Sequence, residues 1–267
     1  MLDPAFLRPI AHRGLHDAAK GGIENTGPAF EAAIAKGYAI ECDLEAAAGG
    51  LPVVFHDDTL DRLTTSSGPV ARLGADDLKC VRFRDADITG ILTFAAFLEL
   101  CGARVPLVVE IKSDWSAPSR AFLSEIARLA AAHRGPIALM SFDPAVMTAI
   151  RELAPNVPRG IVSGRYRDAN GTLWWPELGR FRSWKLANLL ESGSAAPDFI
   201  AYEVGALPTL ATRLARSVCR LPLLTWTVRT DEDRHRATRY ADASIFEGYE
   251  PCSWRPTKGE PSQQFGS

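Results

Sequence analysis

Along most of the chain, short apolar runs alternate with longer stretches in which apolar residues recur every three or four positions. The short runs predict buried strands and the longer stretches predict amphipathic helices, because the two structures place side chains with different periods. Most of the expected strands precede a helix, and the strands are centred on the segments HRG, ECD, EIK, MSF, GIV, IAY, TWT and SIF. This pattern predicts a (β/α)8 TIM barrel, with its site at the C-terminal ends of the strands.

A β-hairpin is predicted around the glycine pair at 49–50, because apolar strands flank a strong turn signal. Glu41 and Asp43 stand two residues apart in the first strand, so both carboxylates point to one face. A turn centred on the glycine pair places Asp43 opposite His56 and Glu41 opposite Asp58. Carboxylates clustered in this way are costly to bury without a cation or a donor, so a positive group is expected there.

The length of 267 residues fits one barrel domain that spans residues 1–267. Residues 59–104 follow the alternation of expected strands and helices less regularly. We interpret them as a small insertion between the second and third barrel strands, too short to hold a core of its own. The tail from residue 251 to 267 is rich in Pro, Ser, Gly and Gln, and we expect it to be flexible.

Charge and composition exclude several classes of protein. The formal net charge is −2 and the pI about 6.2, so the excess of basic residues that is typical of nucleic-acid-binding proteins is missing. Five cysteines without a CxxC pair favour a reduced protein. The first expected strand begins too early to leave room for a signal peptide, and no apolar run reaches the roughly 20 residues of a membrane span. We therefore expect a cytoplasmic protein without stable membrane insertion; the oligomeric state stays open.

Charged residues end the first three expected strands. His12 ends the first, Glu41 and Asp43 end the second, and Glu110 and Lys112 share a face at the end of the third. Three carboxylates at neighbouring strand ends offer the oxygen ligands that Mg²⁺ or Ca²⁺ prefers. Zinc is disfavoured, because the sequence has no HxH or HExxH spacing and no cysteine accompanies the histidines.

Two basic residues and two histidines complete the expected site. Arg13 and Lys112 supply positive charge that suits a phosphate. His12 and His56 are suited to divide the roles of general base and general acid, because the pKa of imidazole lies near neutrality. A cation, phosphate-binding side chains and a histidine pair together indicate cleavage of a phosphodiester.

The chain resembles the glycerophosphodiester phosphodiesterase family through six motifs in order: HRG at 12–14, ENT at 24–26, ECD at 41–43, VVFHDDTLDR at 53–62, EIK at 110–112 and WTV at 226–228. The resemblance covers most of the chain. It implies that His12 and His56 are the acid–base pair. It also implies that Glu41, Asp43 and Glu110 are the metal ligands and that Arg13 and Lys112 bind the phosphate. It further implies that Glu24 and Asn25 support the metal or the nucleophile, and that Trp226 walls the substrate pocket.

Two positions depart from the family's pattern. Arg229 follows WTV where asparagine is common, and the last strand ends in Phe246 and Glu247 where a small polar residue and an acid are usual. These departures bear on substrate preference more than on the chemistry, because neither position belongs to the histidine or carboxylate set.

Several other polar and aromatic residues are assigned structural roles. His16 is expected in a surface loop, and Asp57 is expected to cap or orient the turn that follows it. Trp174, Trp175 and Trp184 recur at helical spacing, which is typical of core packing more often than of a ligand site.

The resemblance implies metal-dependent hydrolysis of a glycerophosphodiester to glycerol 3-phosphate and an alcohol, through attack of the glycerol 2-hydroxyl and a cyclic phosphate. Three alternatives stay open: a lysophospholipase D or phospholipase-type enzyme acting on lipids, a catalytically silent glycerophosphate-binding barrel, and a lyase that stops at the cyclic phosphate. The sequence shows no evident amphipathic anchor helix or basic membrane-facing cluster, which disfavours the lipid enzymes. All the expected histidines and carboxylates are present, which disfavours the silent barrel. The expected partner is a small-molecule glycerophosphodiester.

Overall fold

Eight parallel strands close into a barrel in the computed structural model, which describes residues 2–17, 22–117 and 119–251. A ninth strand, β3, runs antiparallel beside β2, and the ring closes where β1 pairs with both β2 and β9. The strands are β1 (Ile10–Ala11), β2 (Ala39–Ala46), β3 (Pro52–Val54), β4 (Leu107–Ile111), β5 (Ile137–Ser141), β6 (Arg159–Ser163), β7 (Phe199–Glu203), β8 (Leu223–Val228) and β9 (Ala243–Phe246). The predicted (β/α)8 TIM barrel is confirmed.

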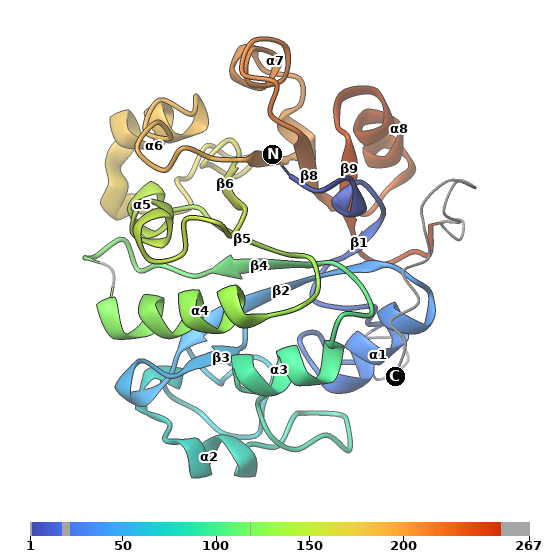
Figure 1. Cartoon of the computed structure of the whole chain (residues 1–267), viewed down its shortest axis with the longest axis vertical. Coiled ribbons are helices and arrows are strands. Elements are labelled where there is room, and N and C mark those ends of the chain that lie inside the picture. The colour runs from blue at the N-terminus through green and yellow to red at the C-terminus, as the bar shows by residue number, and fades with distance from the viewer. Residues whose placement is uncertain (1, 18–21, 118, 252–267) are drawn as a thin grey trace.

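Helices surround the barrel (Figure 1), and most of them connect one parallel strand to the next. Several begin at a side-chain cap: Asp143 accepts the backbone N–H of Ala145, and Thr230 accepts that of Asp233. The helices are α1 (Gly27–Ala35), α2 (Ala75–Cys80), α3 (Phe94–Cys101), α4 (Arg120–Ala132), α5 (Pro144–Leu153), α6 (Gly179–Ala187), α7 (Leu210–Ser217) and α8 (Asp231–Tyr240).

Alternation along the strands separates two layers of core. In β4, Leu107 and Val109 pack outward against the helices, while Val108 packs into the barrel interior. Glu110 follows Val108 at the same parity, so its carboxylate points inward at the C-terminal end of the strand. The same alternation in β2 turns Cys42 outward, where it packs in the layer between strands and helices, and turns the acids on either side of it inward.

The barrel interior is filled below the site. Gly160 leaves room for the ring of Phe199 on the neighbouring strand, since a Cβ at Gly160 would lie 2.3 Å from a ring carbon. At the N-terminal end, Leu2 and Phe6 pack into the same interior cluster. Functional side chains therefore have space at the opposite, C-terminal end of the strands.

The β2–β3 hairpin forms as expected, but its predicted register is wrong by one residue. Leu44 pairs with Val54, and the backbone N–H of Phe55 donates to the carbonyl of Asp43 at 3.1 Å. The expected pairing of Asp43 with His56 assumed a two-residue turn, whereas the connection at 47–51 has an odd number of residues. His56 therefore lies beyond the strand and approaches the site from the loop that follows β3.

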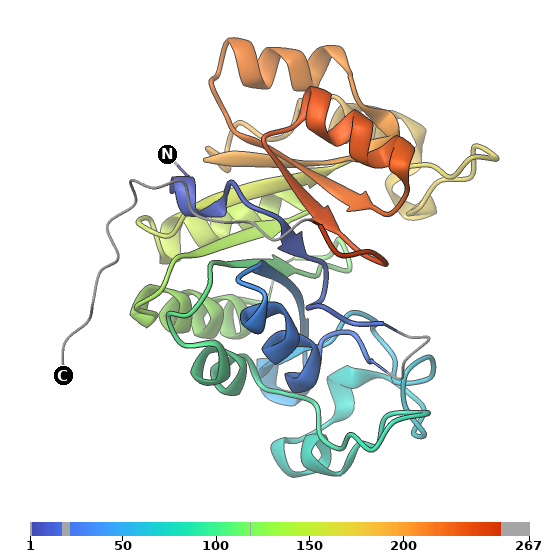
Figure 2. The same cartoon turned by 90° about the vertical axis from the view of Figure 1, so that its right-hand side faces the viewer.

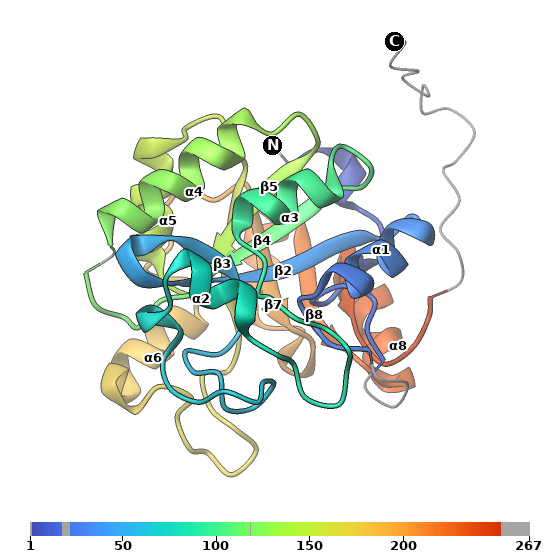
Figure 3. The same ribbon diagram turned by 90° about the horizontal axis from the view of Figure 1, so that it is seen from below.

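The segment 59–104 holds two kinds of structure. Its first part and α2 bury a satellite cluster that includes Val70, Leu78 and Phe83 and lies at the lower end of the molecule (Figures 1 and 2). Helix α3, which we expected inside the insertion, instead packs against α1 and α4 in the helical layer of the barrel. Figure 3 shows β3 and α2 from that end. Most of the C-terminal tail lies outside the described residues.

In the part of the chain that the structure describes, every helix is too short or too polar to cross a membrane.

Candidate active site

Three buried carboxylates meet at the C-terminal end of β2 and β4. Glu41 and Asp43 come from β2 and Glu110 from β4, and Asp43 is the register partner of Glu110. One oxygen of each lies within 4.8 Å of the others. The donor set consists of oxygen alone, which suits a hard divalent cation such as Mg²⁺ or Ca²⁺. The structure thus brings together the three residues that were expected to bind metal.

Two cations border these carboxylates. Lys112 Nζ lies 2.7 Å from Asp43 Oδ1 and 2.5 Å from Glu110 Oε1, and Arg13 Nε lies 3.2 Å from Asp43 Oδ2. Burial favours the neutral form of Asp43, but the positive charges around it, Lys112 first, hold its pKa well below the usual range. Burial and the two neighbouring acids raise the pKa of Glu41 well above the usual range.

The charge balance of this cluster fits a metal site. Three ionised carboxylates and two cations leave one negative charge, and a bound divalent cation reverses its sign. The net positive charge of the cluster with a bound cation complements the single negative charge of a phosphodiester. The raised pKa of Glu41 is the effect expected of a buried carboxylate that lacks enough positive charge nearby, and a divalent cation supplies it.

Glu24 and Asn25 stand behind the cluster, where the resemblance placed supporting residues. Asn25 is buried, and its Nδ2 donates to Asp43 Oδ2 at 2.9 Å. Glu24 Oε1 accepts from Arg13 Nη1 at 2.7 Å and also from Arg62 at 2.7 Å. These bonds fix the orientation of Asp43 and Arg13, as outer partners of metal ligands commonly do.

His12 is positioned by the last barrel strand. Because Ala11 pairs with Phe246, the next residues, His12 and Glu247, lie side by side. His12 Nδ1 is 2.7 Å from Glu247 Oε2, and Nε2 points toward Glu41 at 4.0 Å. Burial lowers the pKa of His12, while the Glu247 carboxylate acts to raise it. Arg229 Nη2 donates to the same Oε2 at 2.7 Å.

His56 has a similar carboxylate partner. Its Nδ1 is 2.7 Å from Asp57 Oδ1, and Arg62 donates to both oxygens of Asp57 at 2.6 and 3.0 Å. We expected Asp57 to serve the turn, but its carboxylate binds the imidazole and the guanidinium. Each histidine therefore contacts a carboxylate through Nδ1, which leaves Nε2 as the nitrogen for chemistry.

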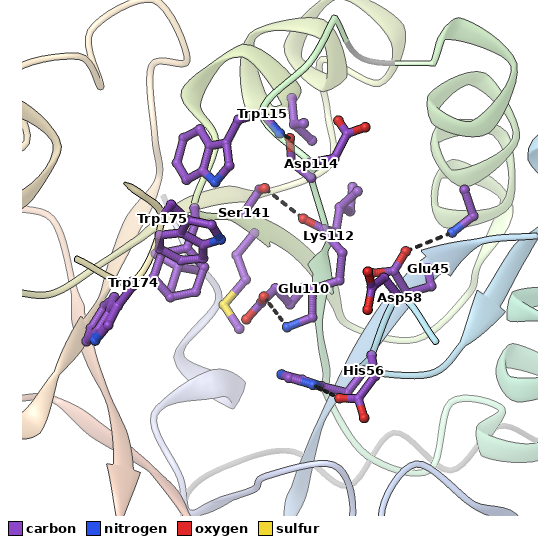
Figure 4. Close-up of a pocket in the computed structure, with 18 of the residues that line it drawn as sticks. Glu45, His56, Asp58, Glu110, Lys112, Asp114, Trp115, Ser141, Trp174 and Trp175 are labelled. Atoms are coloured by element: carbon purple, nitrogen blue, oxygen red, sulfur yellow. Dashed lines mark hydrogen bonds and ion pairs between the residues drawn. The ribbon is translucent and has the colours of Figure 1, made fainter. Parts of the chain in front are cut away.

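A pocket of about 1230 Å³ opens over these residues. It is lined by both histidines, by Arg13 and Lys112, and by Glu41 and Glu110; Glu45 and Asp58 lie on a further side. Figure 4 shows Trp115, Trp174 and Trp175 gathered on the side away from Glu45. The pocket thus joins a charged floor to an aromatic wall, which suits a ligand with a phosphate and a second group.

The aromatic wall differs from the expectation for the tryptophans. Trp174 and Trp175 lie in the loop before α6 and line the pocket, where core packing had been expected. Trp184 is half exposed on the outer side of α6. Trp226 lies on β8 and lines the pocket, as the resemblance implied. His16 is partly buried and lies outside the pocket lining.

Sequence reasoning missed several residues of the site. Trp115 and Phe142 complete the aromatic wall from the loops after β4 and β5, with ring centroids 5.3 and 5.1 Å from that of Trp175. Their positions just beyond strand ends are a signal that sequence alone offers. Glu247 and Arg229 were noted only as departures from the family, and the contact with His12 became visible in the fold.

The closed parallel barrel, with its acidic cluster and two histidines at the C-terminal strand ends, defines a TIM-barrel enzyme with a candidate metal site. The family model described as the glycerophosphoryl diester phosphodiesterase family matches residues 12–246. The chain belongs to this family and is a phosphodiesterase.

Curated relatives agree with this assignment. The chain is 27% identical over 240 residues to a glycerophosphodiester phosphodiesterase of Caldanaerobacter subterraneus subsp. tengcongensis, covering 85% of this chain and 88% of that protein. It is 43% identical over 72 residues to glycerophosphodiester phosphodiesterase 1 of Bos taurus, a match that covers 26% of this chain and only 20% of the bovine protein.

Solved structures share the fold. An Oleispira antarctica phosphodiesterase, determined in complex with sn-glycerol-3-phosphate, aligns with a TM-score of 0.67 at 19% identity over 90% of this chain and 92% of that one. A glycerophosphoryl diester phosphodiesterase structure from Silicibacter pomeroyi aligns with a TM-score of 0.66 at 25% identity over 92% and 91% of the two chains.

Proposed function

We propose that the chain hydrolyses glycerophosphodiesters to glycerol 3-phosphate and an alcohol, with a divalent cation and the two histidines as the catalytic groups. The observation that carries this proposal is the flanking of one acidic cluster by two histidines, each held through Nδ1 by a carboxylate at 2.7 Å. Family membership and the named relatives support the reaction class.

Glu41, Asp43 and Glu110 would hold the cation, Mg²⁺ or Ca²⁺. When bound, it would supply Lewis-acid stabilisation of the charge on the phosphoryl oxygens. Arg13 and Lys112 lie at the same cluster and would bind phosphoryl oxygens, Arg13 as a planar fork and Lys112 as a point charge. Asn25 and Glu24 would keep Asp43 and Arg13 in place through the bonds described above.

His12 and His56 would move the protons. One Nε2 would take the proton of the attacking hydroxyl, and the other would protonate the departing alcohol. Because the hydrogen bonds of the two histidines go to Glu247 and Asp57, and not to a serine, threonine or cysteine side chain, the glycerol 2-hydroxyl is the proposed nucleophile. Its tether to phosphorus gives a high effective concentration, and the histidines would exchange roles when water opens the cyclic phosphate.

The aromatic wall would hold the alcohol. Trp115, Trp174, Trp175 and Trp226 line the pocket beyond the charged floor, so the phosphate can bind the floor while the rest of the diester contacts the rings. Trp226 belongs to a barrel strand and has the most rigid support. The alcohol group is the part of the substrate that this wall selects.

Phosphorus NMR of the metal-supplemented protein with a panel of glycerophosphodiesters tests the proposal. We expect the diester resonance to decline and a monoester resonance to grow. A cyclic phosphate resonance should appear after the diester begins to decline and before the monoester is fully formed. Unchanged diester across the whole panel, with Mg²⁺ and with Ca²⁺, would contradict it. A cyclic phosphate that accumulates without monoester would instead identify a lyase.

A further inference from the structure

Large exposed apolar side chains of the described structure are concentrated in one part of the chain. Eight such side chains are exposed, and six of them fall between residues 181 and 218: Phe181, Trp184, Leu190, Leu210, Leu214 and Val218. We name the set formed by α6, α7 and these six residues the α6–α7 face. It lies at the end of the molecule opposite to α2 (Figure 1). Concentrated apolar surface of this kind marks an interaction site.

Helix α7 turns its larger apolar residues outward. Leu210, Leu214 and Val218 recur every four residues, so they form one stripe, and they are 72%, 48% and 70% exposed. The buried face of the same helix consists of smaller residues, including Thr212 and Ala215. This distribution is the reverse of an ordinary barrel helix, whose larger apolar residues face the strands.

Helix α6 presents an aromatic pair. Phe181 and Trp184 are 71% and 50% exposed, and their rings stack with centroids 6.2 Å apart. Lys185 Nζ lies 5.5 Å from the centroid of the Phe181 ring. The opposite side of α6, through Leu186, packs into the cluster that contains Trp174 and Trp175. The α6 part of the α6–α7 face therefore backs directly onto the aromatic wall of the pocket.

The charge of this face is positive. The segments 179–187 and 209–220 contain six basic residues and no acidic residue. Arg182 and Lys185 pair with Glu191, and Arg216 pairs with Asp242, from outside the two segments. Arg180, Arg213 and Arg220 make no ion pair within the described residues and are exposed. Basic residues thus border the apolar stripe on a protein whose net charge is −2.

We propose that the α6–α7 face docks on the surface of an anionic phospholipid bilayer. Leucine, valine, phenylalanine and tryptophan side chains beside arginines are the composition of helices that lie in a membrane interface. The apolar stripe would enter the boundary of the acyl region, and the free arginines would meet lipid phosphates. A second copy of the chain fits less well, because a two-fold interface would bring arginines against arginines.

This proposal corrects an expectation from the sequence and goes beyond the proposed reaction. The sequence was interpreted as lacking an evident amphipathic anchor helix or basic membrane-facing cluster, because apolar spacing does not reveal which side of α7 faces the strands. The structure shows that the buried side of α7 is formed by small residues, Thr212 and Ala215. Docking through this face would place the aromatic side of the pocket near the bilayer.

Vesicle sedimentation tests the proposal without any measurement of catalysis. The full chain is mixed with vesicles of phosphatidylcholine or of phosphatidylcholine with phosphatidylserine, at low and high salt. We expect binding to the phosphatidylserine vesicles that weakens as salt rises, because exposed charges are screened. No binding to these vesicles, or equal binding to both compositions, would overturn the proposal.

Matched variants locate the contact. Leu214→Ser, and Arg213→Glu combined with Arg220→Glu, should each lower vesicle binding roughly tenfold or more, because each removes a group that meets lipid. The controls are Leu153→Ser on α5 and Arg134→Glu, which are also exposed but do not belong to the α6–α7 face. Melting temperature and turnover of a soluble diester should stay unchanged in all of them. Equal loss in the controls would overturn the assignment.

Two further readouts separate the alternatives. Brominated phosphatidylcholine mixed with phosphatidylserine should quench tryptophan fluorescence of the chain, and Trp184→Phe should remove most of that quenching. Quenching that persists in full would overturn insertion of this face. Light scattering without lipid should give a mass that Leu214→Ser leaves unchanged; a dimer that this variant dissociates would overturn the proposal in favour of a second copy.

Discussion

Arg229 and His12 contact the same carboxylate oxygen of Glu247, each at 2.7 Å. Both contacts follow from barrel register, because Val228 and Ala11 are the partners of Phe246 on its two sides. Arg229 and Glu247, which were noted with Phe246 as departures from the family's pattern, therefore form one ion pair beside a proposed catalytic histidine. Glu247 has its pKa lowered to about 2, first by its bond with His12, so it is ionised at neutral pH.

Glu247→Gln should shift the His12 limb of the pH–rate profile to lower pH. The Glu247 carboxylate favours the protonated imidazole and so raises the pKa of His12. Loss of the Glu247 carboxylate lowers the pKa of His12. The limb therefore moves to lower pH whether His12 acts as acid or as base. The measurement is the profile of kcat/KM with metal in excess. An unchanged or upward-shifted limb would contradict the contact.

Arg229→Asn should shift the same limb in the opposite direction. The Arg229 guanidinium offsets part of the charge of Glu247, so its removal strengthens the effect of the carboxylate on His12 and raises that pKa. Arg239→Asn, another exposed arginine of the same half of the barrel, is the control and should leave the profile unchanged. Shifts of equal sign in the Arg229 and Glu247 variants would sink the electrostatic account.

Chelation should abolish activity, and Mg²⁺ or Ca²⁺ should restore it. Glu41→Gln and Glu110→Gln should lose activity for the same reason, because each removes one oxygen ligand from the cluster. The cation would stabilise charge that develops during the reaction, so the loss should appear in kcat and not only in KM. Calorimetric titration of metal into wild type and variants checks binding directly. Full activity in excess chelator would exclude this role for the carboxylates.

His12→Ala and His56→Ala should each lower kcat on the order of 10²-fold or more, the usual range for a positioned acid or base. The double variant should lose much less than the product of the two losses, because both residues serve one proton-transfer scheme. A substrate with a good leaving group should rescue the variant that lacks the acid and not the one that lacks the base. Near wild-type turnover of an unactivated diester in either variant would remove that histidine from the scheme.

An analogue that contains propane-1,3-diol in place of glycerol should bind and resist hydrolysis. The phosphodiester is retained, but the hydroxyl next to it is gone, so intramolecular attack is impossible. Competition against a glycerol substrate measures binding, and phosphorus NMR measures turnover. If the analogue were cleaved at a rate close to that of the glycerol substrate, water would be the nucleophile.

The parts of the fold that depend on local pattern could be predicted from the sequence. Alternation along β2 and β4 correctly turned Glu41, Asp43 and Glu110 to one side, because strand parity is a local property. The hairpin register depended on the length of one turn, and an error of one residue there reversed the expected faces around His56. The partner of His12 lies 235 residues away in the chain, and only closure of the barrel brings Glu247 beside it.

His56 depends on a weaker part of the molecule than His12 does. His12 follows a strand that has a strand partner on each side within the closed ring, whereas His56 follows β3, which lies outside the ring and pairs with β2 and, through one bridge, with Thr93. An element outside the closed ring can open with a smaller free energy than the ring strands do. Opening of β3 would remove one histidine while the barrel stays closed, so inactivation of this protein can precede its unfolding.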